Sequence, residues 1–497
     1  MSIIKYLIIC LLGVGWRVAD AAYADEPAHA GFFSDEFSLT LAPGHRTEIF
    51  GPLYYSELQE SQRTWAIPPL TLSHTEDPVT ESEEWDFAYP ALTYDRYGKE
   101  YRWQIFQVFS FAGGRDQDLT ANRRFTLFPF YFQQRSTDPA QNYTAVFPFY
   151  GELKHRLYHD QIDFVMFPLY ARTRKKDVVT LNAPYPIFSL REGDGLRGWK
   201  FWPITGHEHK TPTTVTNNQG ELKPSAGHDS RFVLWPFFTK STNGIGTTNL
   251  LKQEALIPFY SLYRSRPRDS TSYGWPIGVT HTEDREKKYV ETDAPWPLIE
   301  FAHGEGKSEQ RVWPFYSRAT NTLWDDKQNV SHLEGNWYCW PIYKYNRVTS
   351  PPLDRERTRI LFFLYSWVNL KNTETGKTFQ RSDFWPLYTH RKELNGNERL
   401  QIMAILEPIF PNNKSMQRDY AQLYSFWRAE KNPKTGAASQ SLLWNLYRHE
   451  VTPQAKKTSL LFGLLQYEST RAGKHWRVCY LPARKTAPVW PEAATGH

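Results

Sequence analysis

One phrase occurs three times in quick succession, in Phe125-Thr-Leu-Phe-Pro-Phe-Tyr131, Ala145-Val-Phe-Pro-Phe-Tyr150 and Val165-Met-Phe-Pro-Leu-Tyr170. In each copy an aromatic residue precedes Pro, and an apolar and an aromatic residue follow it. The copies are 19 and 20 residues apart, and similar phrases recur almost to the C-terminus. A fixed period of this kind is the sequence signature of a repeat protein.

The recurring Pro residues also define a longer period. Five units form a block of roughly 108 residues, because Pro129 and Pro236 are 107 residues apart and Pro148 and Pro258 are 110 apart. The chain therefore looks like repeated duplication of one block. The structural Pro residues of the repeat are Pro129, Pro148, Pro168, Pro186, Pro203, Pro236, Pro258, Pro276, Pro297, Pro314, Pro341, Pro386 and Pro408.

The block period divides the chain into segments. Residues 1–24 are predicted to be a signal peptide, because Lys5 precedes a short apolar run at Tyr6–Val14 and the Ala-x-Ala site Ala22-Tyr23-Ala24 follows. Residues 25–46 are expected to be loose, 47–482 to form the β-repeat domain and 483–497 to be a polar tail. Within the domain we expect a partial block at 47–124, full blocks at 125–230, 231–336 and 337–440, and degenerate units at 441–482.

Each unit is predicted to be one short β-strand. The residues around Pro are Phe, Trp, Tyr, Val and Ile, which favour strands, and an interior Pro would break a helix. The sequence thus predicts an all-β antiparallel meander of about 22 strands, built as a bent or stacked sheet or as a closed barrel. Because Pro cannot donate to a β-ladder, each strand is expected to bend at its Pro. Two longer polar insertions are expected to be loops, Lys210–Ser230 and Arg318–Asn336.

Composition and charge limit the classes of protein to which the chain can belong. Aromatic residues make up 16% and charged residues 23% of the chain, which is not the composition of a disordered protein. The net charge of +6 is spread over 497 residues without a basic block, so we expect no nucleic-acid partner. The signal peptide predicts export to the periplasm or the outer membrane. Cys339 and Cys479 are too few and too far apart to form a disulfide framework, and their spacing fits either one disulfide or two buried thiols.

Candidate sites are few. His207-Glu-His209 places two imidazoles on one strand face, so His207 and His209 are weak metal-binding candidates, and a solvated polar strand end is the favoured interpretation. The chain contains no nucleophile elbow, no phosphate-binding Gly loop and no HExxH motif. We therefore predict a protein that is not an enzyme and has no catalytic residues and no cofactor.

Phrases such as Trp313-Pro-Phe-Tyr316 and Trp385-Pro-Leu-Tyr388 resemble those of a group of uncharacterised exported bacterial proteins that carry the motif in tandem. The resemblance covers nearly the whole chain and implies a location in the cell envelope. The first hypothesis is a water-soluble, non-catalytic β-repeat scaffold or binding surface of the cell envelope. Its candidate partners are an envelope glycan, a lipid or another envelope protein, and an association with the membrane is compatible with it. The alternatives are an outer-membrane β-barrel that serves as a pore or in transport, and an enzyme acting on glycans or lipids.

Overall fold

The computed structural model describes residues 33–479, apart from 107, 116–120, 217–221, 276, 325–329 and 472. The predicted signal peptide at 1–24, the tail at 483–497 and Pro276 lie outside the described residues. Within them the chain forms one antiparallel sheet of 42 strands and a separate two-stranded hairpin.

The strands of the first half are β1 (Asp35–Ser38), β2 (Gly44–Ile49), β3 (Tyr54–Gln59), β4 (Gln62–Ile67), β5 (Leu72–Asp77), β6 (Ser82–Phe87), β7 (Leu92–Tyr97), β8 (Glu100–Ile105), β9 (Phe109–Arg115), β10 (Ala121–Leu127), β11 (Tyr131–Ser136), β12 (Tyr143–Val146), β13 (Tyr150–Arg156), β14 (His159–Val165), β15 (Tyr170–Lys175), β16 (Val178–Asn182), β17 (Phe188–Gly193), β18 (Leu196–Phe201), β19 (Thr205–Lys210), β20 (Thr213–Thr216), β21 (Leu222–Ser225) and β22 (Gly227–Val233). Those of the second half are β23 (Phe238–Ile245), β24 (Leu251–Leu256), β25 (Tyr260–Arg264), β26 (Arg268–Tyr273), β27 (Val279–Asp284), β28 (Tyr289–Asp293), β29 (Ile299–Gly304), β30 (Lys307–Val312), β31 (Tyr316–Trp324), β32 (Val330–Tyr338), β33 (Tyr343–Ser350), β34 (Leu353–Ile360), β35 (Tyr365–Asn372), β36 (Thr378–Phe384), β37 (Tyr388–Lys392), β38 (Glu398–Ile402), β39 (Trp427–Asn432), β40 (Ala437–Leu442), β41 (Tyr447–Val451), β42 (Ala455–Leu460), β43 (Leu465–Thr470) and β44 (Gly473–Val478). Two short helices, α2 (Lys414–Asp419) and α3 (Ala421–Tyr424), lie between β38 and β39.

The sheet is a continuous meander in which each strand pairs antiparallel with its neighbours in the chain. The one step that skips strands joins β19 to β22, because the β20–β21 hairpin is inserted there. The predicted antiparallel all-β meander is therefore confirmed. The sheet is not closed, since within the described residues β1 pairs with β2 alone and β44 with β43 alone.

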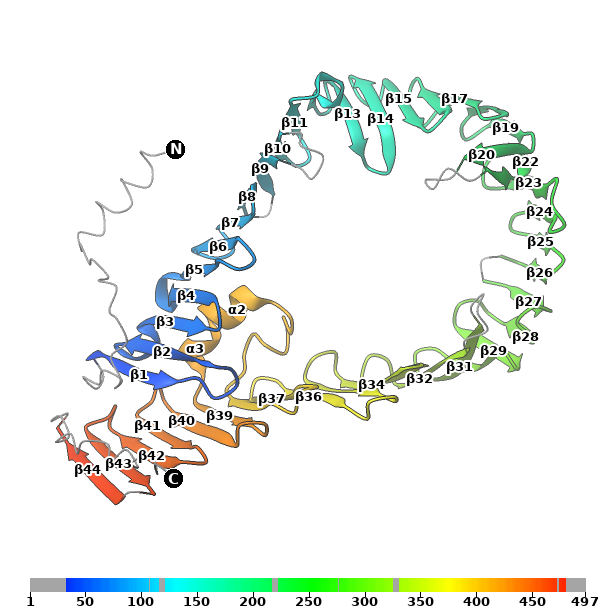
Figure 1. The fold of residues 1–497 in the computed structure, drawn as a ribbon. Coiled ribbons are helices and arrows are strands. Elements are labelled where there is room, and N and C mark those ends of the chain that lie inside the picture. The colour runs from blue at the N-terminus through cyan, green and yellow to red at the C-terminus, as the bar shows by residue number, and fades with distance from the viewer. Residues whose placement is uncertain are drawn as a thin grey trace, which may run out of the picture.

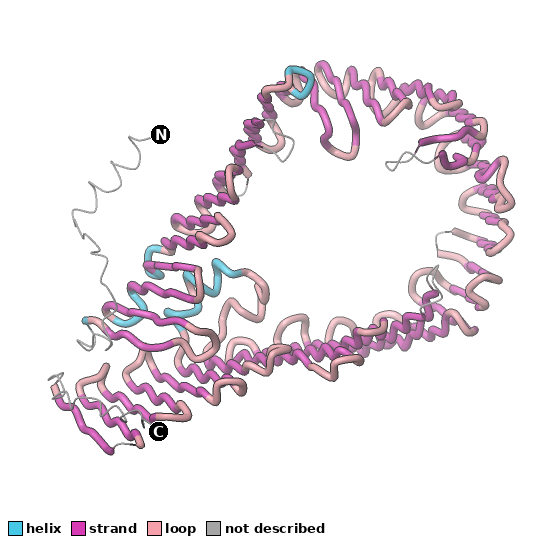
Figure 2. Tube along the Cα trace, viewed as in Figure 1, coloured by secondary structure: helices cyan, strands magenta, loops and turns pink. Residues whose placement is uncertain are grey.

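The sheet is a narrow ribbon that sweeps round in a wide arc (Figures 1 and 2). A strand of six residues spans roughly 20 Å, so the ribbon is about that wide. At the end of the arc the N-terminal strands β1–β4 lie beside α2, α3 and the strands around β39–β41 (Figure 1). The N-terminal strands of the sheet thus meet its C-terminal part. Hydrogen bonds and ion pairs of side chains join the two parts, and no strand pairing does so within the described residues.

The recurring Pro residues lie in turns, and this corrects the prediction that each Pro bends a strand. Apart from Pro408, every described Pro of the repeat lies in the short turn between two consecutive strands and follows a cis peptide bond. A turn needs no ladder donor from Pro. Each unit of about 20 residues therefore supplies two strands, such as β14 and β15 on either side of Pro168, and the predicted strand number was too low.

Segments predicted to be irregular also contribute strands. Residues 35–38 and 44–46, within the segment expected to be loose, form β1 and the start of β2. The insertion Arg318–Asn336 extends β31 and β32 to nine residues each. The insertion Lys210–Ser230 holds the β20–β21 hairpin and the start of β22. Polar composition was a poor guide here, because a single-layer sheet exposes both faces to solvent.

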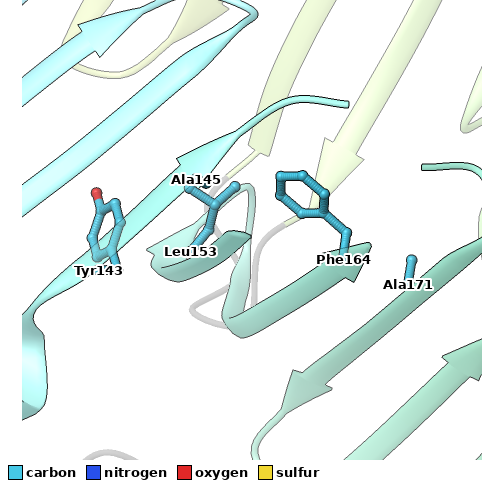
Figure 3. Packing of buried hydrophobic residues seen from close by; sticks show 5 residues of the cluster. All are labelled: Tyr143, Ala145, Leu153, Phe164 and Ala171. Atoms are coloured by element: carbon cyan, nitrogen blue, oxygen red, sulfur yellow. The ribbon is translucent and has the colours of Figure 1, made fainter. Parts of the chain in front are cut away.

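Few apolar side chains of the described residues are fully buried, because the sheet is one layer thick. The clearest cluster lies on one face of β12–β15 and consists of Tyr143, Ala145, Leu153, Phe164 and Ala171 (Figure 3). Ala145 faces Gly151, and Gly151 faces Phe164 on the next strand. A Cβ added at Gly151 would lie 2.2 Å from the Cα of Ala145. The close approach of β12 and β13 thus requires Gly at this position.

We expect Gly151→Ala to lower the free energy of unfolding by about 1–3 kcal/mol, because the new methyl group overpacks the backbone of β12. Gly335→Ala is the matched control, since a Cβ at that strand position meets only the side-chain amide of Asn346, at 3.4 Å. Urea unfolding of the two variants checks the difference. Equal unfolding midpoints would contradict the role assigned to Gly151.

Candidate functional site

The two long edges of the ribbon differ in chemistry. Turns that carry the repeat phrase form one edge, which we call the aromatic turn edge; it comprises residues 128–130, 147–149, 166–169, 183–187, 202–204, 234–237, 257–259, 294–298, 313–315, 339–342, 361–364, 385–387, 443–446 and 461–464. The turns on the opposite, polar turn edge are rich in charged residues and Gly, as in Lys175-Lys-Asp177 and Gly193-Asp-Gly195. The ribbon is therefore amphipathic across its width.

Large apolar side chains stand exposed along the aromatic turn edge. The residue that follows Pro shows this best, because Leu169, Phe237, Phe259 and Phe315 are 61%, 54%, 68% and 66% exposed. Trp residues that precede Pro are also partly exposed, among them Trp235, Trp313 and Trp340. Exposed apolar surface of this extent is typical of interaction sites.

The strand residues next to the aromatic turns are also large, and they extend the apolar surface from the edge onto one face of the sheet. In register they run Tyr316–Tyr338–Tyr343–Ile360–Tyr365, each directly opposite the next. The other face carries small residues at the adjoining positions, such as Ala171, Ser189 and Ser317. Large side chains therefore line one face beside the aromatic turn edge, and small side chains line the other.

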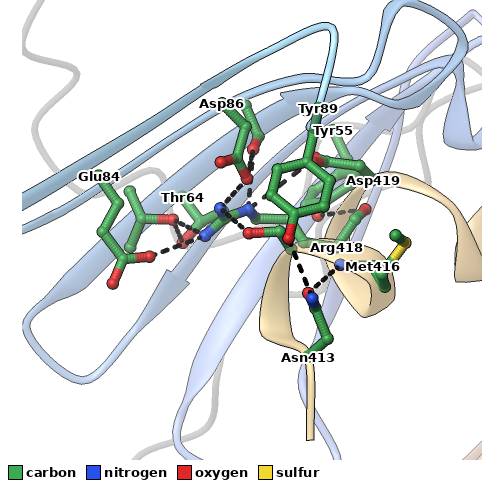
Figure 4. Close-up of polar contacts among 12 residues, drawn as sticks. Tyr55, Thr64, Glu84, Asp86, Tyr89, Asn413, Met416, Arg418 and Asp419 are labelled. Atoms are coloured by element: carbon green, nitrogen blue, oxygen red, sulfur yellow. Dashed lines mark hydrogen bonds and ion pairs between the residues drawn. The ribbon is translucent and has the colours of Figure 1, made fainter. Parts of the chain in front are cut away.

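Residues 403–426 connect β38 to β39. At this position the other units have a short aromatic turn, and here the connection is longer and contains two helices; we call it the clasp. Its helix α2 packs against β4 and β5. Asn413 caps α2, because its Oδ1 accepts a hydrogen bond from the backbone N–H of Met416 at 2.9 Å (Figure 4). Its Nδ2 donates to the hydroxyl of Tyr89 at 3.0 Å. The Tyr420 hydroxyl donates to the carbonyl of Tyr89 at 2.6 Å. These contacts hold α2 on the N-terminal strands.

Arg418 is the centre of the clasp (Figure 4). Its Nε donates to Ser73 Oγ at 2.8 Å and its Nη1 to Thr75 Oγ1 at 2.9 Å. Its Nη1 lies 3.3 Å from Glu84 Oε2, and its Nη2 pairs with Asp86. The Tyr55 hydroxyl donates to the Arg418 carbonyl at 3.1 Å. One guanidinium therefore joins strands β5 and β6 to a helix more than 300 residues further along the chain.

Asp419 adds a second buried carboxyl to this cluster. Its side chain is fully buried, and its Oδ1 lies 3.9 Å from Arg418 Nε. Burial raises the pKa of Asp419 to about 7; the neighbouring carboxylate of Asp86 adds to the rise and Arg418 opposes it. The cluster thus favours the protonated form of Asp419 when the clasp is closed.

The N-terminal strands and the strands that follow the clasp share a second set of contacts. Thr40 Oγ1 donates to Ser439 Oγ at 2.6 Å, Asn445 Nδ2 donates to Glu48 Oε2 at 2.9 Å, and the Arg448 guanidinium lies 3.5 Å from the ring centroid of Phe37. Contacts between β1–β6 and residues 397–448 therefore fix the two ends of the arc together.

His207 and His209 lie together on one face of β19, as their spacing predicted. His207 Nε2 lies 3.0 Å and His209 Nδ1 3.1 Å from the same oxygen, Oδ2 of Asp229 on β22. Hydrogen bonding from His207 lowers the pKa of Asp229. The structure thus places a carboxylate between the two rings, a partner that the sequence reasoning missed because the β20–β21 hairpin separates the strands.

A buried ion network on β28–β30 was also missed. Carboxylate oxygens of Glu291, Asp293 and Glu300 lie within 4.8 Å of one another. Lys307 Nζ lies 2.7 Å from Glu291 Oε2 and also contacts Glu300. Burial raises the pKa of Asp293 to about 6, and the charge of Glu291 adds to this rise. The sequence does show charged residues at every second position, in Glu291-Thr-Asp293 and in Lys307-Ser-Glu309-Gln-Arg311. Alternate residues share a strand face, so this spacing could have predicted the cluster.

Cys339 and Cys479 are free and exposed in the structure, so they are neither paired nor buried and both sequence-based alternatives are wrong. No protein-family model matches the chain, and no curated protein is similar to it. Within the described residues, no helix has the length and apolarity needed to cross a membrane.

Proposed function

We propose that the protein is a non-catalytic β-repeat scaffold of the cell envelope that rests its aromatic turn edge in the interfacial region of a lipid membrane. The observation that supports this proposal is the division of the ribbon into one apolar and one polar edge. Immersing the aromatic turn edge would remove the exposed Phe, Leu and Trp side chains from water, while the charged turns would stay in solvent.

The composition of the edge favours lipid as the partner. Trp and Tyr concentrate where apolar membrane meets water, because each ring has an apolar body and a polar group. The apolar turns recur along most of an arc of 42 strands, and a protein partner would need a matching surface of the same length and curvature. A lipid surface accepts such an edge without any register.

The test compares two matched sets of four substitutions to Ser. The first set removes the exposed residue after Pro at Leu169, Phe237, Phe259 and Phe315. The control set removes exposed apolar residues from the polar turn edge, Val79, Tyr97, Leu157 and Tyr158. Binding is measured by co-sedimentation with sucrose-loaded vesicles of phosphatidylethanolamine and phosphatidylglycerol.

We expect the first set to reduce partitioning onto vesicles at least about tenfold, because burying one Leu or Phe side chain contributes roughly 1.5–3 kcal/mol. The control set should bind like the unmodified protein. Circular dichroism confirms that both variants keep their strands. Unmodified protein that stays in the supernatant, or equal losses in the two sets, would refute the proposal.

A further inference from the structure

The ion network on β28–β30 is built from residues on one face of three neighbouring strands. Asp293 faces Glu300 and Glu300 faces Arg311, while Glu291 is in register with Ala302 and Ala302 with Glu309. Ala302, the smallest residue in this set, leaves room between the two Glu side chains. Three of the four acidic residues are buried, since Asp293, Glu300 and Glu309 are 3%, 4% and 9% exposed, and the Glu291 side chain is 12% exposed.

The charges of this network do not balance. Glu291, Asp293, Glu300 and Glu309 carry four negative charges, and Lys307 and Arg311 supply two positive ones. The next pair on the same face, Arg268 and Asp284, face each other on β26 and β27 and balance each other. Uncompensated buried carboxylates are costly, so they recruit a proton or a cation.

One buried carboxylate oxygen of the network has no hydrogen-bond partner among the described residues. Within the described residues, no donor lies at hydrogen-bonding distance from the buried Oδ1 of Asp293. Lys307 bridges Glu291 and Glu300, and Arg311 pairs with Glu300 and Glu309. Asp293 is thus the acidic group in this network that neither cation reaches.

We propose that Glu291, Asp293 and Glu300 form a binding site for a hard divalent cation such as Ca²⁺. Carboxylate oxygens are the ligands that Ca²⁺ prefers, and it accepts irregular arrangements of them. One such ion would balance the excess negative charge of the network and give Asp293 Oδ1 a partner. The proposal is independent of the lipid proposal, because none of its residues belongs to the aromatic turn edge.

The experiment titrates the purified full chain with Ca²⁺ alone by isothermal calorimetry, after treatment with a chelator. Tb³⁺ luminescence gives a second readout, because Tyr289 lies on the same face and its ring centroid is 5.9 Å from Lys307 Nζ. We expect saturable binding with a Kd no weaker than about 1 mM, and displacement of Tb³⁺ by Ca²⁺. Absence of saturable binding would overturn the proposal.

Three variants locate the site. Asp293→Asn should weaken Ca²⁺ binding at least about tenfold, since it removes one ligand charge. Glu305→Gln changes an exposed carboxylate of the turn between β29 and β30 and should leave binding unchanged. Lys307→Met removes the ammonium that competes for Glu291 and Glu300 and should tighten binding.

Two results would contradict the proposed cation site. Binding that survives Asp293→Asn unchanged would place the ion elsewhere. Binding that is lost in a folded Lys307→Met variant would show that Lys307 supports the ion instead of competing with it. Either outcome overturns the site, and the Lys307 variant keeps the test decisive if Asp293→Asn fails to fold.

Discussion

Arg418→Ala is expected to separate the two ends of the arc. The guanidinium binds Ser73, Thr75, Glu84 and Asp86 at once, and its loss leaves buried carboxylates without a counter-charge. Removing one partner from a buried ion pair typically costs about 3–5 kcal/mol. We therefore expect the clasp to detach from β4 and β5 and the radius of gyration, measured by small-angle X-ray scattering, to increase.

Lys414→Ala is the matched control, because Lys414 is an exposed residue of the same helix. It should leave the scattering curve unchanged. Arg418→Lys should give an intermediate result, since an ammonium keeps the charge but cannot reproduce the forked contacts of a guanidinium. An Arg418→Ala protein with an unchanged radius of gyration would mean that the contacts of β1 and β2 suffice to hold the ends.

The fold class followed from the sequence, but the strand number did not, and the reason lies in the polar half of each hairpin. After Tyr170 the strand β15 continues as Ala-Arg-Thr-Arg-Lys175, which looks like a loop. Beyond Ala171 this half of the strand is largely exposed to solvent, so it shows no apolar alternation. The phrase around Pro was therefore interpreted as the strand, although it forms the turn and the strand ends beside it.

The clasp was beyond sequence reasoning, because its contacts join residues that are far apart in the chain. Arg418 and Asp86 are 332 positions apart, and nothing local marks them as partners. One sign was present at Glu407-Pro408, where a charged residue replaces the aromatic or apolar residue that precedes Pro in other units. In the structure Glu407 accepts hydrogen bonds from Gln401 and from Tyr424 at 2.7 Å each, so this phrase builds the clasp.

The closed clasp is expected to be more stable at low pH, and Asp419 is the group responsible. Its pKa is about 7 in the closed state and near 4 when exposed, so the closed state binds a proton that the open state releases. The stabilisation is fully present below about pH 4, declines as pH rises and is lost above about pH 7. The groups around Asp419 are Asp86, Arg418 and Tyr55, and the difference in pKa corresponds to at most about 4 kcal/mol.

Scattering between pH 5 and pH 8 measures this dependence in the unmodified protein and in Asp419→Asn. The unmodified protein should show its smaller radius of gyration at pH 5, where the Asp419 carboxyl carries a proton. Asn cannot ionise, so the variant should stay closed at pH 8 and respond much less to pH. If Asp419→Asn instead opens the arc at pH 8 while the unmodified protein remains closed, the ionised carboxylate must stabilise the clasp, and the sign assigned to Asp419 would be wrong.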